Sequence, residues 1–172
     1  FWDCTTKGTL GEGQGEVREL RTLNRVIRIT KDGYELEADP RHAEIIVAEL
    51  GLKDSNAVAT PCTKTKFEIG HDKNLVGDEA TAYRAITARA NYLSQDRIEL
   101  MYATMTASRS MKSPTKGALK ELKRLGRYLQ GRKRAVIRFD WQGECKREMN
   151  PLYVTGEGDA DHASCKVTRR SV

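Results

Sequence analysis

Apolar and polar residues alternate in two short stretches near the N-terminus. Between residues 20 and 30, Ile27 and Ile29 alternate with polar neighbours, and residues 34–39 alternate in the same way. A period of two is typical of a strand that buries one face. A Lys-Asp-Gly sequence ending at Gly33 separates the stretches, and glycine adopts the positive φ of a tight turn at little cost. The pattern therefore predicts a β-hairpin.

Four later segments have the apolar spacing of an α-helix, three or four residues apart. The first covers residues 40–51, since Asp39 and Pro40 form a good helix start and Gly51 a good end. A loop over residues 53–78 follows, and Asp78 is expected to cap the second helix. The residues expected on the buried faces of the first three helices are Ala43, Ile46, Val47 and Leu50; Tyr83, Ile86, Ala90 and Leu93; and Ile98, Met101, Tyr102 and Met105.

The fourth helix is predicted over residues 115–130, between Pro114 and Gly131. Two apolar strands follow it, at residues 135–140 and 152–154. Helices followed by a fresh pair of strands suggest two modules. We therefore expect an α+β chain with a boundary near Gly131, in which residues 132–172 begin a second unit.

Composition excludes some classes of protein. The chain has 172 residues, of which 38% are hydrophobic, and no stretch approaches the roughly 18 apolar residues of a membrane helix. Its four cysteines form no Cys-x-x-Cys pair, and the start shows neither Met nor an export signal. We expect a piece of a longer intracellular protein with reduced thiols and no membrane partner.

The net charge of +6 is unevenly distributed. Residues 109–134 contain ten Lys or Arg and one acid, a local charge of +9, so the rest of the chain sums to −3. Within the fourth helix, the leucines fall on one side and five cations fall within an arc of about 100° on the other. These are Lys116, Lys120, Lys123, Arg124 and Arg127.

The five cations would extend along roughly 16 Å of helix, at ~1.5 Å per residue. Duplex nucleic acid carries one phosphate charge per about 1.7 Å of axis, so such a row would contact several phosphates. A solvated helix face that is rich in Lys and Arg explains the same pattern. The segment alone leaves both interpretations open.

The densest cluster of chemical groups is near the C-terminus. Asp159 and Asp161 follow an apolar strand and are two residues apart, so they would share one face if the strand continues. Carboxylate oxygens are the ligands that divalent cations such as Mg²⁺ prefer. The alternative is an acidic turn that ends the strand. No nucleophile elbow or phosphate-binding glycine loop occurs.

Together, these landmarks resemble the reverse transcriptase–RNase H region of copia-type (Pseudoviridae-like) retrotransposon polyproteins. The likeness covers about residues 17–172. The stretches that carry it are residues 23–27 with Gly33 and Asp39-Pro40-Arg41-His42; Ala59-Thr60-Pro61; Tyr83-Arg84-Ala85 through Arg97; the helix 119–129; and Gly158-Asp159-Ala160-Asp161 with Cys165 and residues 168–171. Three positions depart from the family pattern: Asn24 for Gly, Ile98 for Pro, and His162 for Trp.

The resemblance implies a role in RNA-directed DNA synthesis. Residues 1–131 would be the C-terminal part of a reverse transcriptase, a hairpin plus thumb- and connection-like helices. Residues 132–172 would open an RNase H-like α/β domain. The basic helix would face an RNA/DNA hybrid or other duplex, and Asp159 would be the first RNase H metal ligand, with Asp161 as its neighbour and Mg²⁺ as the cofactor.

The resemblance also implies that both active centres are incomplete. The polymerase motif of the family ends in Asp-Asp, and no such pair occurs in the sequence. We expect the fragment alone neither to polymerise nor to cleave, and to need the remainder of the polyprotein. Two rivals remain: a small basic non-enzymatic module, whose leucine face binds a partner protein, and a metal-dependent nuclease using both aspartates.

Overall fold

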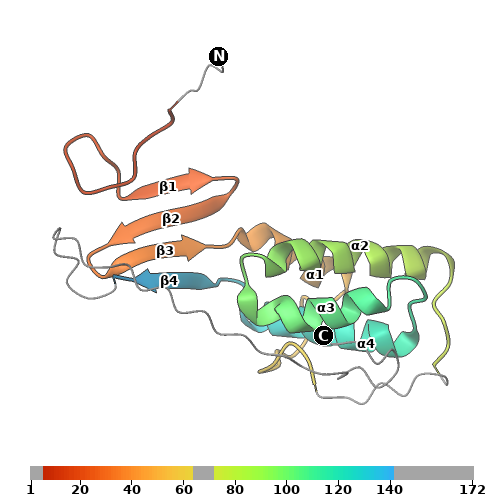
Figure 1. Cartoon of the computed structure of the whole chain (residues 1–172). Coiled ribbons are helices and arrows are strands. Elements are labelled where there is room, and N and C mark those ends of the chain that lie inside the picture. Colours follow the sequence, from red (N-terminus) through yellow and green to blue (C-terminus); the bar gives the residue numbers. More distant parts are fainter. Residues whose placement is uncertain (1–5, 64–71, 142–172) are drawn as a thin grey trace, which may run out of the picture.

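The computed structural model describes residues 6–63 and 72–141. Four antiparallel strands form one sheet in the order β1-β2-β3-β4, and four helices pack beside it (Figure 1). This confirms the expected α+β class. The elements are β1 (Glu19–Thr22), β2 (Arg25–Thr30), β3 (Gly33–Glu37), α1 (Pro40–Glu49), α2 (Gly77–Ser94), the 3-10 helix η1 (Ile98–Leu100), α3 (Met101–Arg109), α4 (Lys116–Gly131) and β4 (Val136–Asp140).

The first predicted strand is two strands. Residues 20–30 turn back on themselves at Leu23 and Asn24, and the Thr22–Arg25 pair closes the turn. Both turn residues have positive φ, 50° at Leu23 and 62° at Asn24. Such a turn normally contains glycine, so a Leu-Asn pair gave no turn signal in the sequence. The second hairpin, between β2 and β3, lies where it was predicted, with Gly33 opposite Thr30.

The strand predicted after Gly131 joins this same sheet. β4 pairs antiparallel with β3, from Gly33 opposite Asp140 to Glu37 opposite Val136. The pairing continues at both ends, because Ala38 N–H donates to the Ala135 carbonyl and Trp141 N–H donates to the Asp32 carbonyl. Residues 136–140 are therefore part of the same sheet as the N-terminal hairpins. The rest of the expected second unit lies outside the described residues.

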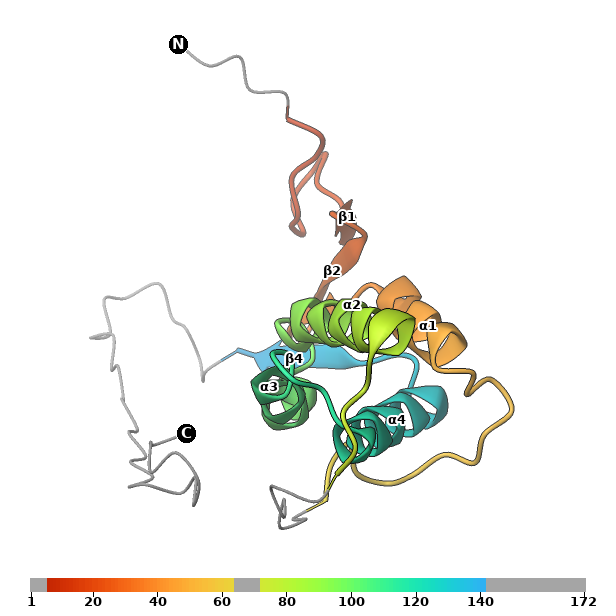
Figure 2. The same cartoon turned by 90° about the vertical axis from the view of Figure 1, so that its right-hand side faces the viewer.

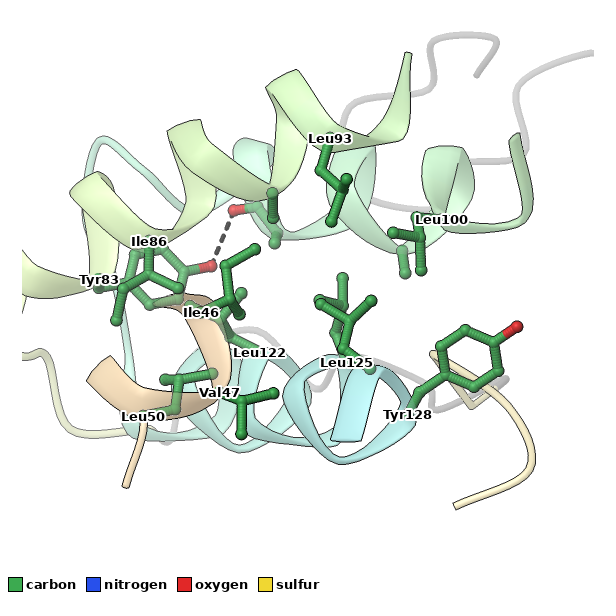
Figure 3. Close-up of a cluster of buried hydrophobic side chains, with 14 of the residues drawn as sticks. Ile46, Val47, Leu50, Tyr83, Ile86, Leu93, Leu100, Leu122, Leu125 and Tyr128 are labelled. Carbon is green, nitrogen blue, oxygen red and sulfur yellow. Dashed lines mark hydrogen bonds between the residues drawn. The ribbon is translucent and has the colours of Figure 1, made fainter. Parts of the chain in front are cut away.

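The core lies among the helices (Figure 3). α1 begins where it was predicted: the Asp39 side chain accepts a hydrogen bond from Arg41 N–H, and Gly51 after the helix has a φ of 67°. Ile46 and Val47 face α2 and α4, as the periodicity indicated. The Tyr83 ring is buried and its hydroxyl donates to the Ala107 carbonyl over 2.8 Å, which joins α2 to α3.

Two helix predictions were wrong in detail. Asp78 does not cap α2; it lies in the first turn, where its charge favours the positive end of the helix dipole, and Val76 is the N-cap residue. In the third helix the predicted face points outward. Ile98, Met101 and Tyr102 are 62%, 55% and 58% exposed, whereas small side chains, such as those of Ala103 and Ala107, face the core and let α3 lie close to α2.

The two faces of the sheet differ in chemistry. One face is apolar and carries Tyr34, which lies opposite Phe139 on β4 and makes an edge-on ring contact with Trp141, at 4.8 Å between centroids. The other face carries ion pairs that run across strands. Arg28 donates to Glu37, and Arg134, which precedes β4, donates to both oxygens of the same carboxylate. Glu37 is buried and joins three segments.

Protonation of Glu37 should destabilise the sheet. The two hydrogen bonds from Arg134, and then the one from Arg28, hold the pKa of Glu37 below its ordinary value despite burial. A depressed folded-state pKa stabilises the protein above the ordinary carboxyl pKa of about 4.3, and this stabilisation is lost as pH falls through the folded value. We expect the free energy of unfolding to fall below about pH 4 and the fall to be shallower in Glu37→Gln.

Urea unfolding between pH 3 and pH 6 would measure this difference. Asp39 retains part of the acid sensitivity in the variant, because the Arg41 side chain lowers the pKa of that carboxyl as well. Identical pH profiles for the wild type and Glu37→Gln would contradict the assignment.

Candidate nucleic-acid interface

α4 places its leucines inside and its lysines outside. Thr115 caps the helix by accepting a hydrogen bond from Ala118 N–H. Leu122, Leu125 and Leu129 are at most 1% exposed and pack in the core. The face that the rival hypothesis assigned to a partner protein is therefore covered by the chain's own helices.

Three of the five predicted cations form an open row. Lys116, Lys120 and Lys123 are exposed, and within the described ranges none of their side chains forms an ion pair or hydrogen bond. They occupy positions i, i+4 and i+7, so they share a face over roughly 10 Å of the helix axis. With Leu75 and Leu119 they line a shallow groove of about 310 Å³. Glu79 on α2 is the acidic residue that lines the same groove.

The other two cations bind the loop that follows α1. The Arg124 guanidinium donates to the Thr60 hydroxyl over 2.9 Å, and Arg127 donates to the Asn56 carbonyl over 2.7 Å. Gln130 continues the row by donating to the Lys53 carbonyl. The loop therefore runs alongside α4 (Figure 2). Since Arg124 and Arg127 are half-buried and already hydrogen-bonded, they are less available to phosphates than the three lysines.

An arginine outside the predicted site fixes the far end of α4. Arg97 is 2% exposed. Its guanidinium pairs with Glu99 and donates to the Arg132 carbonyl over 2.7 Å, just after the last turn of the helix. Its charged end also lies 6.0 Å from the centroid of the Tyr128 ring. The sequence indicated Arg97 only through the family resemblance, and the geometry gives it a structural role.

The predicted metal ligands, Asp159 and Asp161, lie outside the described residues, so their arrangement and Mg²⁺ binding stay predictions. Within residues 6–63 and 72–141, no three His, Cys, Asp or Glu side chains gather as a metal would require. In the same part of the chain, no helix combines the length and apolar character needed to cross a bilayer.

Comparison with known proteins adds no assignment: no family model, curated protein or solved structure matches this chain.

Proposed function

We propose that this chain binds an RNA/DNA hybrid, or duplex nucleic acid of similar geometry, through the exposed lysine row of α4. We further propose that it is part of a copia-type retrotransposon polyprotein, from the end of the reverse transcriptase into RNase H. It would contribute contacts to the template–primer without a complete active site of its own.

The observation that supports this proposal best is the lysine row itself. Three ammonium groups share one face of a rigid, capped helix, and the described residues offer no acid paired with any of them. A phosphate backbone supplies negative charges at the spacing that such a row meets. Arg124 and Arg127 would add to the positive potential from the side of the loop.

Charge reversal of Lys116, Lys120 and Lys123 to Glu tests the proposal. Each phosphate contact contributes about 0.9 to the slope of log K against log salt. We expect the triple variant to lose affinity for an RNA/DNA hybrid by about tenfold or more and the slope to fall by roughly 2.7. Fluorescence anisotropy across a salt series would measure both quantities.

A matched variant separates the row from net charge. Reversal of Lys7, Arg21 and Lys31 changes the total charge by the same amount, and these exposed residues lie in the N-terminal part, away from α4. The control variant should keep most of the wild-type affinity. Equal losses in the two variants, or unchanged binding by the α4 variant, would rule out the lysine row as the interface.

A non-enzymatic protein-binding module is the second candidate. The exposed apolar residues of η1 and α3 favour it, because the α4 leucines are buried. These residues are Ile98, Met101 and Tyr102. Under this alternative, hybrid binding would be absent, or any polyanion of equal charge would displace the hybrid fully. Competition with heparin distinguishes the two candidates.

A further inference from the structure

Thr60 occupies an unusual place in the loop that covers α4. Thr60 is exposed, and the next residue is Pro61. On either side, Val58 and Cys62 pack against the hydrophobic core. The loop is thus anchored before and after Thr60, and the hydroxyl is held at the surface between the two anchors.

The partner of that hydroxyl is a cation with spare hydrogen-bonding capacity. Arg124 Nη2 donates to Thr60 Oγ1 over 2.9 Å, and Arg124 Nε is buried with no hydrogen-bond partner. Nε and Nη2 lie on the same edge of the guanidinium, the edge that can pair with two oxygens of one phosphate. A neutral hydroxyl uses only half of this edge.

The charges around Thr60 also favour an anion. Lys120, Lys123 and Arg127 are within about one turn of Arg124 on α4. Glu121 is the opposing charge nearby, and its carboxylate accepts a long hydrogen bond, 3.4 Å, from the Thr63 hydroxyl. Four cations against one acid leave the local field positive.

We propose that Thr60 is a phosphorylation site for proline-directed protein kinases, and that the resulting phosphate pairs with Arg124. In the transfer, Thr60 Oγ1 attacks the γ-phosphorus of ATP and its proton passes to the base of the kinase. The bond between the γ-phosphorus and the bridging oxygen breaks, and ADP leaves. The product carries a charge of about −1.5 to −2 at pH 7, beside a guanidinium that was already in contact with its oxygen.

A second dipeptide of the same kind provides an internal comparison. Ser113 is also followed by proline, but Pro114 is fully buried and its carbonyl accepts a hydrogen bond from Leu75 N–H. A kinase must hold its substrate in an extended segment and read the proline ring directly. Pro114 is inaccessible, so Ser113 should not react in the folded chain.

The modification would regulate the lysine row, an effect that rests on the proposed duplex binding. A phosphate dianion neutralises about two cations, so the salt slope for hybrid binding should fall by about 1.8 and affinity should fall with it. The phosphorylation itself, and its pairing with Arg124, do not depend on nucleic acid.

The test uses the full chain, ATP and a purified proline-directed kinase, with peptide mass spectrometry as the readout. We expect one phosphate, at Thr60, that is absent in Thr60→Val, strongly reduced in Pro61→Ala and unchanged in Thr63→Val. No phosphate at Thr60, equal labelling of Ser113, or indifference to Pro61→Ala would overturn the proposal.

Phosphorus NMR then tests the pairing without any nucleic acid. The second pKa of a phosphothreonine is near 6 when it has no partner, and a guanidinium that stabilises the dianion lowers it. We expect a lower value in the phosphorylated wild type than in phosphorylated Arg124→Gln, in which it should return towards 6. Equal values would refute the Arg124 contact. If both results hold but the lysine variants bind hybrid normally, only the proposed function fails.

Discussion

Replacing Arg97 by Ala should lower the free energy of unfolding by about 3 kcal/mol or more. Truncating a large, fully buried side chain leaves a cavity, which usually costs about 2–5 kcal/mol. The change also removes the donor for the Arg132 carbonyl and the partner of Glu99. The Arg132 carbonyl is in a part-buried hydrogen bond, and loss of its donor adds a cost of up to about 1–3 kcal/mol.

Two further variants separate these causes. Arg97→Met keeps most of the volume and loses only the polar contacts, so about 1–3 kcal/mol is expected. Arg21→Ala truncates an exposed arginine on β1 whose side chain forms no ion pair or hydrogen bond in the described part of the chain. It should change stability by less than about 0.5 kcal/mol. Urea unfolding monitored by circular dichroism measures all three. An Arg97→Ala protein as stable as Arg21→Ala would show that the guanidinium does not hold α4 in place.

The helices were predictable where the local signals agreed. Asp39, Pro40 and Gly51 fixed the limits of α1, and the apolar spacing correctly placed Tyr83 and Leu93 in the core. α3 shows the limit of the same reasoning. The large apolar residues predicted for this helix have helical spacing, yet the buried side of α3 is formed by Ala103, Thr104 and Ala107, because small side chains let two helices approach closely. The apolar periodicity identifies an apolar face of a helix, but it does not identify which face packs against another helix.

Contacts between distant parts of the chain were not predictable. β3 and β4 are about a hundred residues apart, and an alternating pattern does not name its partner strand. The candidate site has the same difficulty. The five cations of α4 look alike in sequence, but Arg124 and Arg127 bind a loop some 70 residues earlier. The position of that loop in the folded chain determines that the two arginines are hydrogen-bonded and the three lysines are exposed.

The pairing of β4 with β3 makes Gly33 a sensitive position. A Cβ added to Gly33 would overlap the Phe139 carbonyl oxygen and lie 2.8 Å from the Asp140 Cα. Both are backbone atoms of β4, so no side-chain rotation relieves the overlap. Gly33 also has a φ of 157°, at the edge of the range that residues with a side chain rarely adopt. Gly33→Ala should therefore displace β4.

We expect Gly33→Ala to destabilise the protein by about 3 kcal/mol, since overpacking and backbone strain each cost roughly 1–3 kcal/mol. Gly51→Ala is the matched control: its φ of 67° imposes strain, but an added Cβ meets no atom within 4 Å, so about 1 kcal/mol is expected. The difference between the two variants measures the β3–β4 contact. In hydrogen exchange, Gly33→Ala should also deprotect the Ala38 and Trp141 amides, which donate to the two flanks of that pairing. Equal destabilisation by the two variants, with those amides still protected, would mean that β4 does not pack against Gly33.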